Sequence, residues 1–199
     1  MSGYQVPKAP LEVEEVIKNS RFITRILPTS TVEEAKAFIK QLNQQEPDAN
    51  HHCWAYIVGN PASTTLLGCS DDGEPSGTAG KPMLHVLQHS DIGDITAVCT
   101  RYFGGTKLGT GGLARAYGGG VKLALEELET TAKIETSQLV IETHYECEKD
   151  IHHQLKQYQG SVIDTQYGAN LTVSIRLPTE HEKAFKEGLA VRFGEKVKW

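Results

Sequence analysis

The sequence has no long apolar run, and its first residues are not apolar. None of its runs approaches the roughly 20 residues that a membrane-spanning helix needs. The first ten residues, MSGYQVPKAP, lack the apolar centre of a signal peptide. We therefore expect a cytoplasmic protein that does not act at a membrane.

The sequence also has fewer positive than negative charges. The 199 residues include 20 Lys and Arg against 25 Asp and Glu, which gives a formal net charge of -5. This balance argues against a protein that coats nucleic acid through bulk charge, so any anion site must be a local patch. Apolar residues make up 39% of the chain, which is enough for a packed core.

Paired cysteines and known catalytic motifs are missing as well. Cys53, Cys69, Cys99 and Cys147 are scattered without a CxxC pair, and we expect reduced, mostly buried thiols. The chain contains no GxSxG or HExxH motif and no local Cys/His signature. The sequence therefore gives no positive sign of catalysis, and we expect a binding protein without a cofactor rather than an enzyme.

Apolar periodicity and turn signals predict an α+β first domain, residues 1–132. We expect strands at 11–17, 21–27, 51–58, 65–69 and 94–103, and helices at 31–45, 82–88 and 113–129. Asn19-Ser20 is expected to join the first two strands in a hairpin. The pattern from Ser30 to Glu33 predicts a capping box at the first helix.

The last third of the chain predicts a second domain, residues 137–199. Strand and helix patterns follow one another in the order βαββαβ, which is that of the ferredoxin-like split βαβ unit. Polar residues 130–137 between the two parts are expected to form a short linker. We therefore place the domain boundary near Ala132 to Thr136.

The most unusual stretch is RYFGGTKLGTGGLARAYGGG, residues 101–120, which is rich in glycine although glycine costs stability inside regular elements. It is not a phosphate-binding P-loop, because Thr110 and Gly111 stand where Lys and Ser/Thr are needed. It is a poor dinucleotide fingerprint, because the loop after the strand is too long and Glu129 closes a helix instead of ending the next strand.

A less demanding interpretation is that the glycines expose backbone N-H groups at a helix start, where anions are attracted. The predicted anion or RNA site consists of Arg101, Gly104, Gly105, Lys107, Gly109, Gly111, Gly112 and Arg115, together with Lys81. The alternative is that the glycines serve only tight turns and close packing. Gly112, Ala116, Gly119 and Gly120 follow steps of three and four, so a helix with these residues on one side could approach a neighbour closely.

A second irregular stretch, SDDGEPSGTAGKP, is expected to be a loop. Its carboxylates Asp71, Asp72 and Glu74 are weak candidates for magnesium ligands, but Asp72-Gly73 is a strong turn signal and we favour a turn. Lys81, with Gly77 and Gly80, precedes the next helix and predicts a second anion-receptive helix start.

These motifs resemble those of a known family. The segments SDDGEPSGTAGKPML, GDITAVCTRYFGGTKLGTGGLARAYGGGV, SRFIT and HHCWAY are similar to the IMPACT family, in its bacterial branch, and the resemblance covers essentially the whole chain. It implies a first domain like one shared by a ribosomal protein and elongation factor G, with helices on one face of a β-sheet. It implies a ferredoxin-like second domain.

The resemblance also implies a role in translation. The resemblance implies that eukaryotic relatives regulate an amino-acid-starvation kinase by competing for its activator and carry a further N-terminal partner-binding domain. Because the first strand is expected to begin near Leu11, we expect this chain to lack that domain. We therefore expect a translation-associated protein that binds RNA or the ribosome through the glycine-rich loop. A protein partner in translation control stays open. The alternative is an enzyme or sensor for a small phosphorylated ligand that uses the same loop with magnesium.

Overall fold

The computed structural model describes residues 3–199, which divide into two compact units. Tyr4–Lys133 form one unit and Ile134–Trp199 belong to the other. The segment predicted as a polar linker is instead built from strands, β7 (Thr130–Ile134) and β8 (Thr136–Thr143). Within residues 3–199, no helix is long and apolar enough to cross a membrane.

The first unit is built on a five-stranded antiparallel sheet with the strand order β2-β3-β6-β4-β5. The strands are β2 (Leu11–Ile17), β3 (Ser20–Pro28), β4 (His51–Ile57), β5 (Leu67–Ser70) and β6 (Ile95–Tyr102). The sequence patterns predicted each of these strands to within a few residues. They did not predict β1 (Gly3–Pro7), which pairs with β7 in a separate two-stranded sheet.

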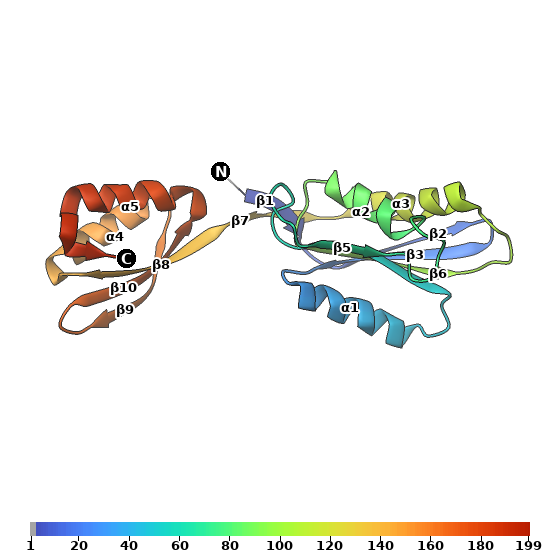
Figure 1. Cartoon of the computed structure of the whole chain (residues 1–199), viewed down its shortest axis with the longest axis horizontal. Coiled ribbons are helices and arrows are strands. Elements are labelled where there is room, and N and C mark those ends of the chain that lie inside the picture. The colour runs from blue at the N-terminus through green and yellow to red at the C-terminus, as the bar shows by residue number, and fades with distance from the viewer. Residues whose placement is uncertain (1–2) are drawn as a thin grey trace. The chain divides into compact units, whose positions relative to one another are not determined.

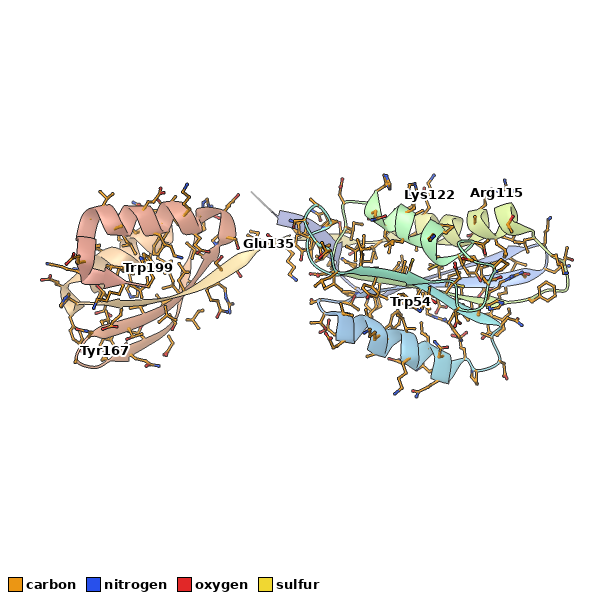
Figure 2. All side chains as sticks on the ribbon, in the orientation of Figure 1. Trp54, Arg115, Lys122, Glu135, Tyr167 and Trp199 are labelled. Atoms are coloured by element: carbon orange, nitrogen blue, oxygen red, sulfur yellow. The ribbon has the colours of Figure 1, made fainter. Side chains whose placement is uncertain are left out.

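Helices cover both faces of the five-stranded sheet, so the prediction of helices on one face was wrong. Figure 1 shows α1 (Val32–Gln45) on one face and α2 (Gly80–Gln88) and α3 (Thr110–Glu127) on the other. The reason lies in β4, whose alternating side chains are apolar on both sides. Cys53 and Ala55 belong to the core that also includes residues of α2 and α3, whereas Trp54 and Tyr56 pack with Ala35 of α1. Figure 2 shows Trp54 on the side of the sheet that carries α1.

The hairpin turn and the cap of the first helix each lie one residue away from the predicted position. The β2-β3 hairpin turns at Lys18 and Asn19, whose positive φ values of 47° and 64° suit a two-residue turn between twisted strands. Helix α1 is capped by Thr31 rather than Ser30, and the Thr31 hydroxyl accepts a hydrogen bond from the Glu34 amide at 3.1 Å.

The glycines of α3 do not break the helix, which runs without interruption from Thr110 and begins three residues earlier than predicted. Gly120 faces β3 so closely that a Cβ atom there would lie 2.4 Å from Thr24 Oγ1. By contrast, a Cβ at Gly119 would meet nothing within 4 Å. Close packing therefore explains Gly120 but not its neighbour.

We predict opposite effects of alanine at these two glycines. Gly120→Ala should lower the free energy of unfolding by about 1–3 kcal/mol, because the methyl group overpacks the contact with Thr24. Gly119→Ala should raise it by about 0.5–1 kcal/mol, because alanine is the better helix former. Urea unfolding of both variants beside the parent protein measures the difference. Equal effects of the two substitutions would contradict the packing explanation.

The second unit has the predicted βαββαβ order. Its elements after β8 are α4 (Glu148–Gln157), β9 (Ser161–Tyr167), β10 (Leu171–Pro178), α5 (Thr179–Phe193) and β11 (Val197–Lys198). The antiparallel sheet has the order β11-β8-β10-β9. Its core is separate from that of the first unit and includes Ile141, Ile151, Val173 and Phe185.

Candidate functional site

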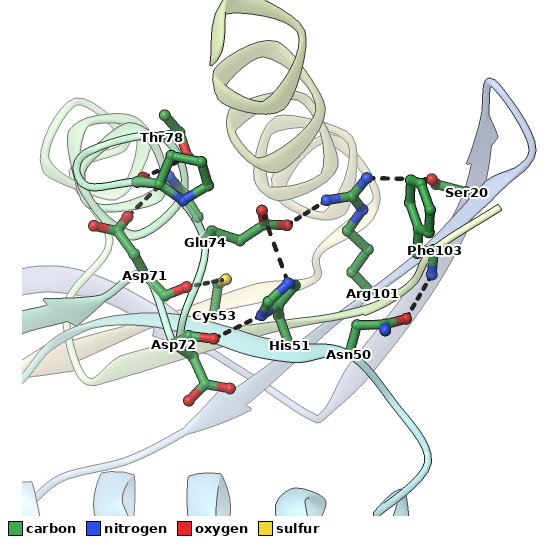
Figure 3. A network of polar contacts seen from close by, with 12 residues as sticks. Ser20, Asn50, His51, Cys53, Asp71, Asp72, Glu74, Thr78, Arg101 and Phe103 are labelled. Atoms are coloured by element: carbon green, nitrogen blue, oxygen red, sulfur yellow. Dashed lines mark hydrogen bonds and ion pairs between the residues drawn. The ribbon is translucent and has the colours of Figure 1, made fainter. Parts of the chain in front are cut away.

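Arg101, near the end of β6, lies at the centre of a buried polar network. Its side chain points to the face that carries α2 and α3, and the residue is only 5% exposed. Nη1 donates to Glu74 Oε1 at 2.6 Å, and Nη2 donates to Ser20 Oγ at 3.3 Å (Figure 3). The sequence placed Arg101 in an anion site, but the structure gives its charge a carboxylate partner within the protein.

Glu74 also accepts a hydrogen bond from α3. The Tyr117 hydroxyl donates to Glu74 Oε1 at 2.7 Å, and Glu74 Oε2 lies 3.9 Å from His51 Nε2. Burial, together with the neighbouring Cys53 and Glu74, raises the pKa of Tyr117 far above its usual value, so Tyr117 remains a donor. Glu74, which the sequence offered as a weak metal ligand, therefore holds loop 71–79 against β6 and α3.

Cys53 lies beside this network, and its thiol is inert. Its Sγ donates to the Asp71 carbonyl oxygen at 3.0 Å, and burial raises its pKa well above the usual range. His52 faces the other side of the sheet, where its ring nitrogens lie 3.0 Å from Thr100 Oγ1 and 3.1 Å from the Glu46 carbonyl. The buried state of Cys53 agrees with the prediction of a packed, reduced thiol.

We predict that the Glu74 carboxylate is essential to the stability of this unit. Glu74→Gln should lower the free energy of unfolding by about 3 kcal/mol, because Arg101 would keep a buried charge without a counter-ion. The matched control is Glu14→Gln, which breaks the exposed pair between Glu14 and Arg21 and should cost much less, because solvent screens that pair. Urea unfolding gives both values. An equal decrease in the free energy of unfolding for both variants would show that the buried pair is no more important to stability than the exposed one.

A cavity of about 360 Å³ opens beside this network. It is lined by Glu74, Pro75, Arg101, Phe103, Lys107, Leu108, Gly109, Thr110 and Leu113. The structure thus brings Arg101, Lys107 and Gly109 of the predicted site around one hollow. Arg101 contributes a further feature, because its buried Nε has no hydrogen-bond partner.

The start of α3 forms part of the cavity wall. The N-cap residue is Gly109, and no side chain caps the helix. The Leu113 amide donates to the Gly109 carbonyl at 2.9 Å, which is the first hydrogen bond of the helix. The amides of residues 110–112 precede that bond and have no partner within the helix, and they carry the positive end of the helix dipole.

Three of the predicted glycines leave this backbone open. A Cβ atom at Gly105, Gly109 or Gly111 would meet nothing within 4 Å. Gly105 and Gly109 have φ values of +84° and +76°, which other residues rarely adopt. These glycines therefore fit the interpretation of an accessible backbone at a helix start.

The other two predicted glycines are explained by packing. A Cβ at Gly104 would lie 1.9 Å from the Asn19 carbonyl oxygen, and the Gly104 amide donates to Ser20 Oγ at 3.2 Å. A Cβ at Gly112 would lie 3.0 Å from Leu108 Cβ. The amide of Gly104 is therefore already used by the protein itself.

Lys81 does not belong to the cavity, and the second predicted anion site is filled by the protein. Asp71 accepts hydrogen bonds from the amides of Gly77, Ala79 and Gly80 at 2.7, 2.9 and 2.9 Å. Burial opposes the ionisation of Asp71, but these bonds outweigh it and lower the pKa of the carboxyl group. Lys81 adds positive charge beside the same carboxylate. The start of α2 is thus already neutralised by an internal anion.

We predict that Asp71 makes the stability of the first unit depend on acid pH. Because its pKa is lower in the folded protein, the ionised group stabilises the fold above the unfolded value of about 3.9, and this contribution is lost as the pH falls through the lowered pKa. Asp71→Asn should therefore cost about 1 kcal/mol at neutral pH and less in acid.

Urea unfolding at a series of pH values measures this effect. Asp48→Asn is the matched control, because it makes the same change at an exposed position of the same unit. A constant difference between Asp71→Asn and the parent protein at all pH values would contradict the assignment.

The three candidate metal ligands do not converge. Asp71 caps α2, Glu74 pairs with Arg101, and Asp72 Oδ2 accepts a hydrogen bond from the His52 amide at 2.6 Å. Across residues 3–199, no group of three or more His, Cys, Asp or Glu side chains is arranged to hold a metal ion. The loop from Asp71 to Ala79 is thus a structural connection between β5 and α2.

Arg115 lies beside the main cavity rather than in it. It lines a smaller hollow of about 200 Å³ with Ile17, Lys18, Leu108, Gly112 and Ala116, and it points outwards from α3 (Figure 2). Leu108 is shared by the two hollows. In the part of the chain that the structure describes, Lys18, Lys107 and Arg115 form no salt bridge.

Sequence reasoning missed the contribution of Phe103. The apolar run from Asp94 predicted it as the last residue of a buried strand, but β6 ends at Tyr102 and Phe103 is 47% exposed at the edge of the cavity. The signal that could have identified it is its place directly before two glycines, where regular strand pairing stops. The partners Ser20 and Tyr117 carry no local signal of their role.

Comparison with known proteins identifies the family. A model described as the Impact N-terminal domain matches residues 18–125, and a model described as a domain of unknown function matches residues 141–196. The chain belongs to the IMPACT family. This IMPACT family member is 45% identical to "IMPACT family member YigZ" of Escherichia coli (strain K12) over 96% of this chain and 93% of that protein.

Two further similarities extend over nearly the whole chain. An "IMPACT family member" of Haemophilus influenzae is 43% identical over 95% of this chain and 92% of its own length. A crystal structure described only as that of a hypothetical protein matches with a TM-score of 0.75 and 43% identity, covering 100% of this chain and 96% of the other. The resemblance to the bacterial branch, inferred from the motifs, is therefore confirmed.

Proposed function

We propose that this IMPACT family member is a translation-associated RNA-binding protein that holds RNA phosphate at the start of α3. The observation that carries the proposal is the uncapped N-terminus of an 18-residue helix in the wall of a cavity that Arg101 and Lys107 also line. Free amides and the helix dipole attract an anion, and phosphate is the anion that RNA offers.

The contrast between the two helix starts supports this assignment. Asp71 supplies the anion at the start of α2, whereas no side chain does so at Gly109. An uncapped start is stabilised when a ligand supplies the missing acceptors. The site at α3 is thus the one that remains available for an external phosphate.

The acidic net charge of -5 requires that the attraction be local. Glu74 lines the cavity, but its charge is balanced by Arg101 at 2.6 Å. Lys107 lines the same cavity, and Lys18 and Arg115 line the hollow next to it. These three cations surround the start of α3 and give it a positive environment on a protein that is acidic overall.

The link to translation rests on the family resemblance. The resemblance implies that the first domain is similar to one of elongation factor G and of a ribosomal protein, and that the second is ferredoxin-like. The βαββαβ order and the β11-β8-β10-β9 sheet agree with a ferredoxin-like arrangement. Fold similarity by itself assigns no activity, so the site carries the proposal.

We predict that the protein binds single-stranded RNA with an affinity that falls steeply as salt rises, because phosphate contacts release counterions. Lys107→Gln should weaken binding and reduce the slope of log K against log salt by about 0.7, the value for one lost contact to a single strand. Lys36→Gln makes the same change at an exposed position of α1 and should alter neither the affinity nor the slope. Fluorescence anisotropy with labelled oligouridylate at several salt concentrations measures both quantities. Absent or salt-insensitive binding would refute the proposal.

Glycine variants separate the helix start from general charge in the same assay. Gly111 and Gly119 are both exposed α3 glycines with open space around a Cβ atom, so alanine should stabilise the protein at either position. Gly111→Ala should weaken RNA binding, because the methyl group stands at the amides of the helix start. Gly119→Ala should leave binding unchanged. Equal affinity of the two variants would exclude the helix start from the binding site.

A small phosphorylated ligand is the second candidate, favoured by the size of the cavity. Its volume of about 360 Å³ lies in the range of 300–1,000 Å³ typical of small-molecule pockets. Asp71, Asp72 and Glu74 each bind a different partner within the protein, so they give no support to a magnesium ion beside such a ligand. A nucleoside monophosphate that binds more tightly than RNA in competition would favour this candidate.

A further inference from the structure

Phe103 is an exposed aromatic residue held at a fixed place by the backbone around it. Its amide donates to Asn50 Oδ1 at 2.7 Å, and the next amide, of Gly104, donates to Ser20 Oγ at 3.2 Å. The Asn50 amide in turn donates to the Arg101 carbonyl at 2.9 Å. The residue is 47% exposed, although its own amide and that of the next residue are held by Asn50 and Ser20.

The Phe103 ring is the outer member of a series of flat groups. The Arg101 guanidinium lies 5.3 Å from the centroid of the buried Phe22 ring and 5.4 Å from that of Phe103. Contact with a guanidinium stabilises an aromatic ring in its place. Phe103 therefore presents a supported aromatic surface that no other aromatic side chain of the described residues covers.

The cavity places this surface next to the phosphate site. Phe103 lines the same hollow as Thr110, the first residue of α3, and Pro75, Leu108 and Leu113 add apolar walls. A flat apolar group bound there would have an aromatic surface on one side and a phosphate position at the helix start on another. A nucleotide unit has this combination of a flat base and a phosphate.

We infer that Phe103 stacks on one base of a single-stranded RNA whose phosphate lies at the start of α3, an inference that rests on the proposed function. Stacking on an aromatic side chain needs a base that is free of a helix, so duplex RNA is a poor ligand. Stacking accepts any base, because every base has a π-face. Phe103 thus contributes affinity and selects single strands, while the phosphate contacts contribute the salt dependence.

Anisotropy with labelled oligouridylate tests this role through two substitutions of Phe103 and one control substitution elsewhere in the unit. Phe103→Leu keeps an apolar side chain but removes the aromatic ring, and it should weaken binding by about 5- to 150-fold. Phe103→Tyr keeps the ring and should bind as the parent does. Leu66→Ala changes another exposed apolar residue of the same unit and should have no effect. Urea unfolding of each variant shows whether it is folded.

An abasic oligonucleotide of the same length separates the base from the phosphate. It carries phosphates without bases, so the parent and Phe103→Leu should bind it equally, and Lys107→Gln should bind it less well than either. If Phe103→Leu binds oligouridylate as the parent does while Lys107→Gln binds it weakly, stacking is refuted and the proposed phosphate contact survives.

Uridine monophosphate and a duplex of the same sequence complete the test. Duplex binding as tight as that of the single strand would overturn the stacking role. Binding of the mononucleotide that depends on Phe103, without binding of the oligonucleotide, would support stacking and refute the RNA function. If neither the mononucleotide nor the oligonucleotide binds, both the inference and the proposed function fail.

Discussion

The ion pair between Arg101 and Glu74 holds the candidate site together. It joins two segments that are 27 residues apart in sequence, and each partner makes a second contact. Arg101 reaches Ser20 of β3, and Glu74 receives the hydroxyl of Tyr117 from α3. A buried pair of this kind is stabilising only when its remaining polar atoms are satisfied. The one donor that is not satisfied, Arg101 Nε, belongs to a residue that lines the cavity.

The two helices that cover this face begin in physically different ways. At the start of α2, three backbone amides donate hydrogen bonds to the Asp71 carboxylate, so the helix dipole is balanced inside the protein. Helix α3 starts at Gly109 without a side-chain cap and next to Lys107. Two sequence stretches that looked alike, each with glycines and a lysine before a helix, thus differ in whether a carboxylate folds back onto the amides.

Local signals in the sequence were enough for most of the secondary structure. The β2-β3 hairpin, α1 and the βαββαβ order of the second unit follow from periodicity and turn residues. The roles of Arg101 and Lys81 did not follow, because their partners are set by the tertiary fold: Glu74 approaches Arg101 from a loop, and Asp71 turns back onto α2. The helix on the second face of the sheet was not expected, because the family resemblance implied helices on one face. The alternating residues of β4 are apolar on both sides, which gives each face a helix to pack against.

The loop before α3 is held at its start by the amides of Phe103 and Gly104. Gly105 and Gly109, both with positive φ and open surroundings, lie at the two ends of residues 106–108. Leu108, the last residue of this segment, packs against the apolar core beside Gly112, so the loop that carries Lys107 is anchored at both ends. One short loop therefore supplies the cavity with both a positive charge, from exposed Lys107, and an apolar wall, from Leu108.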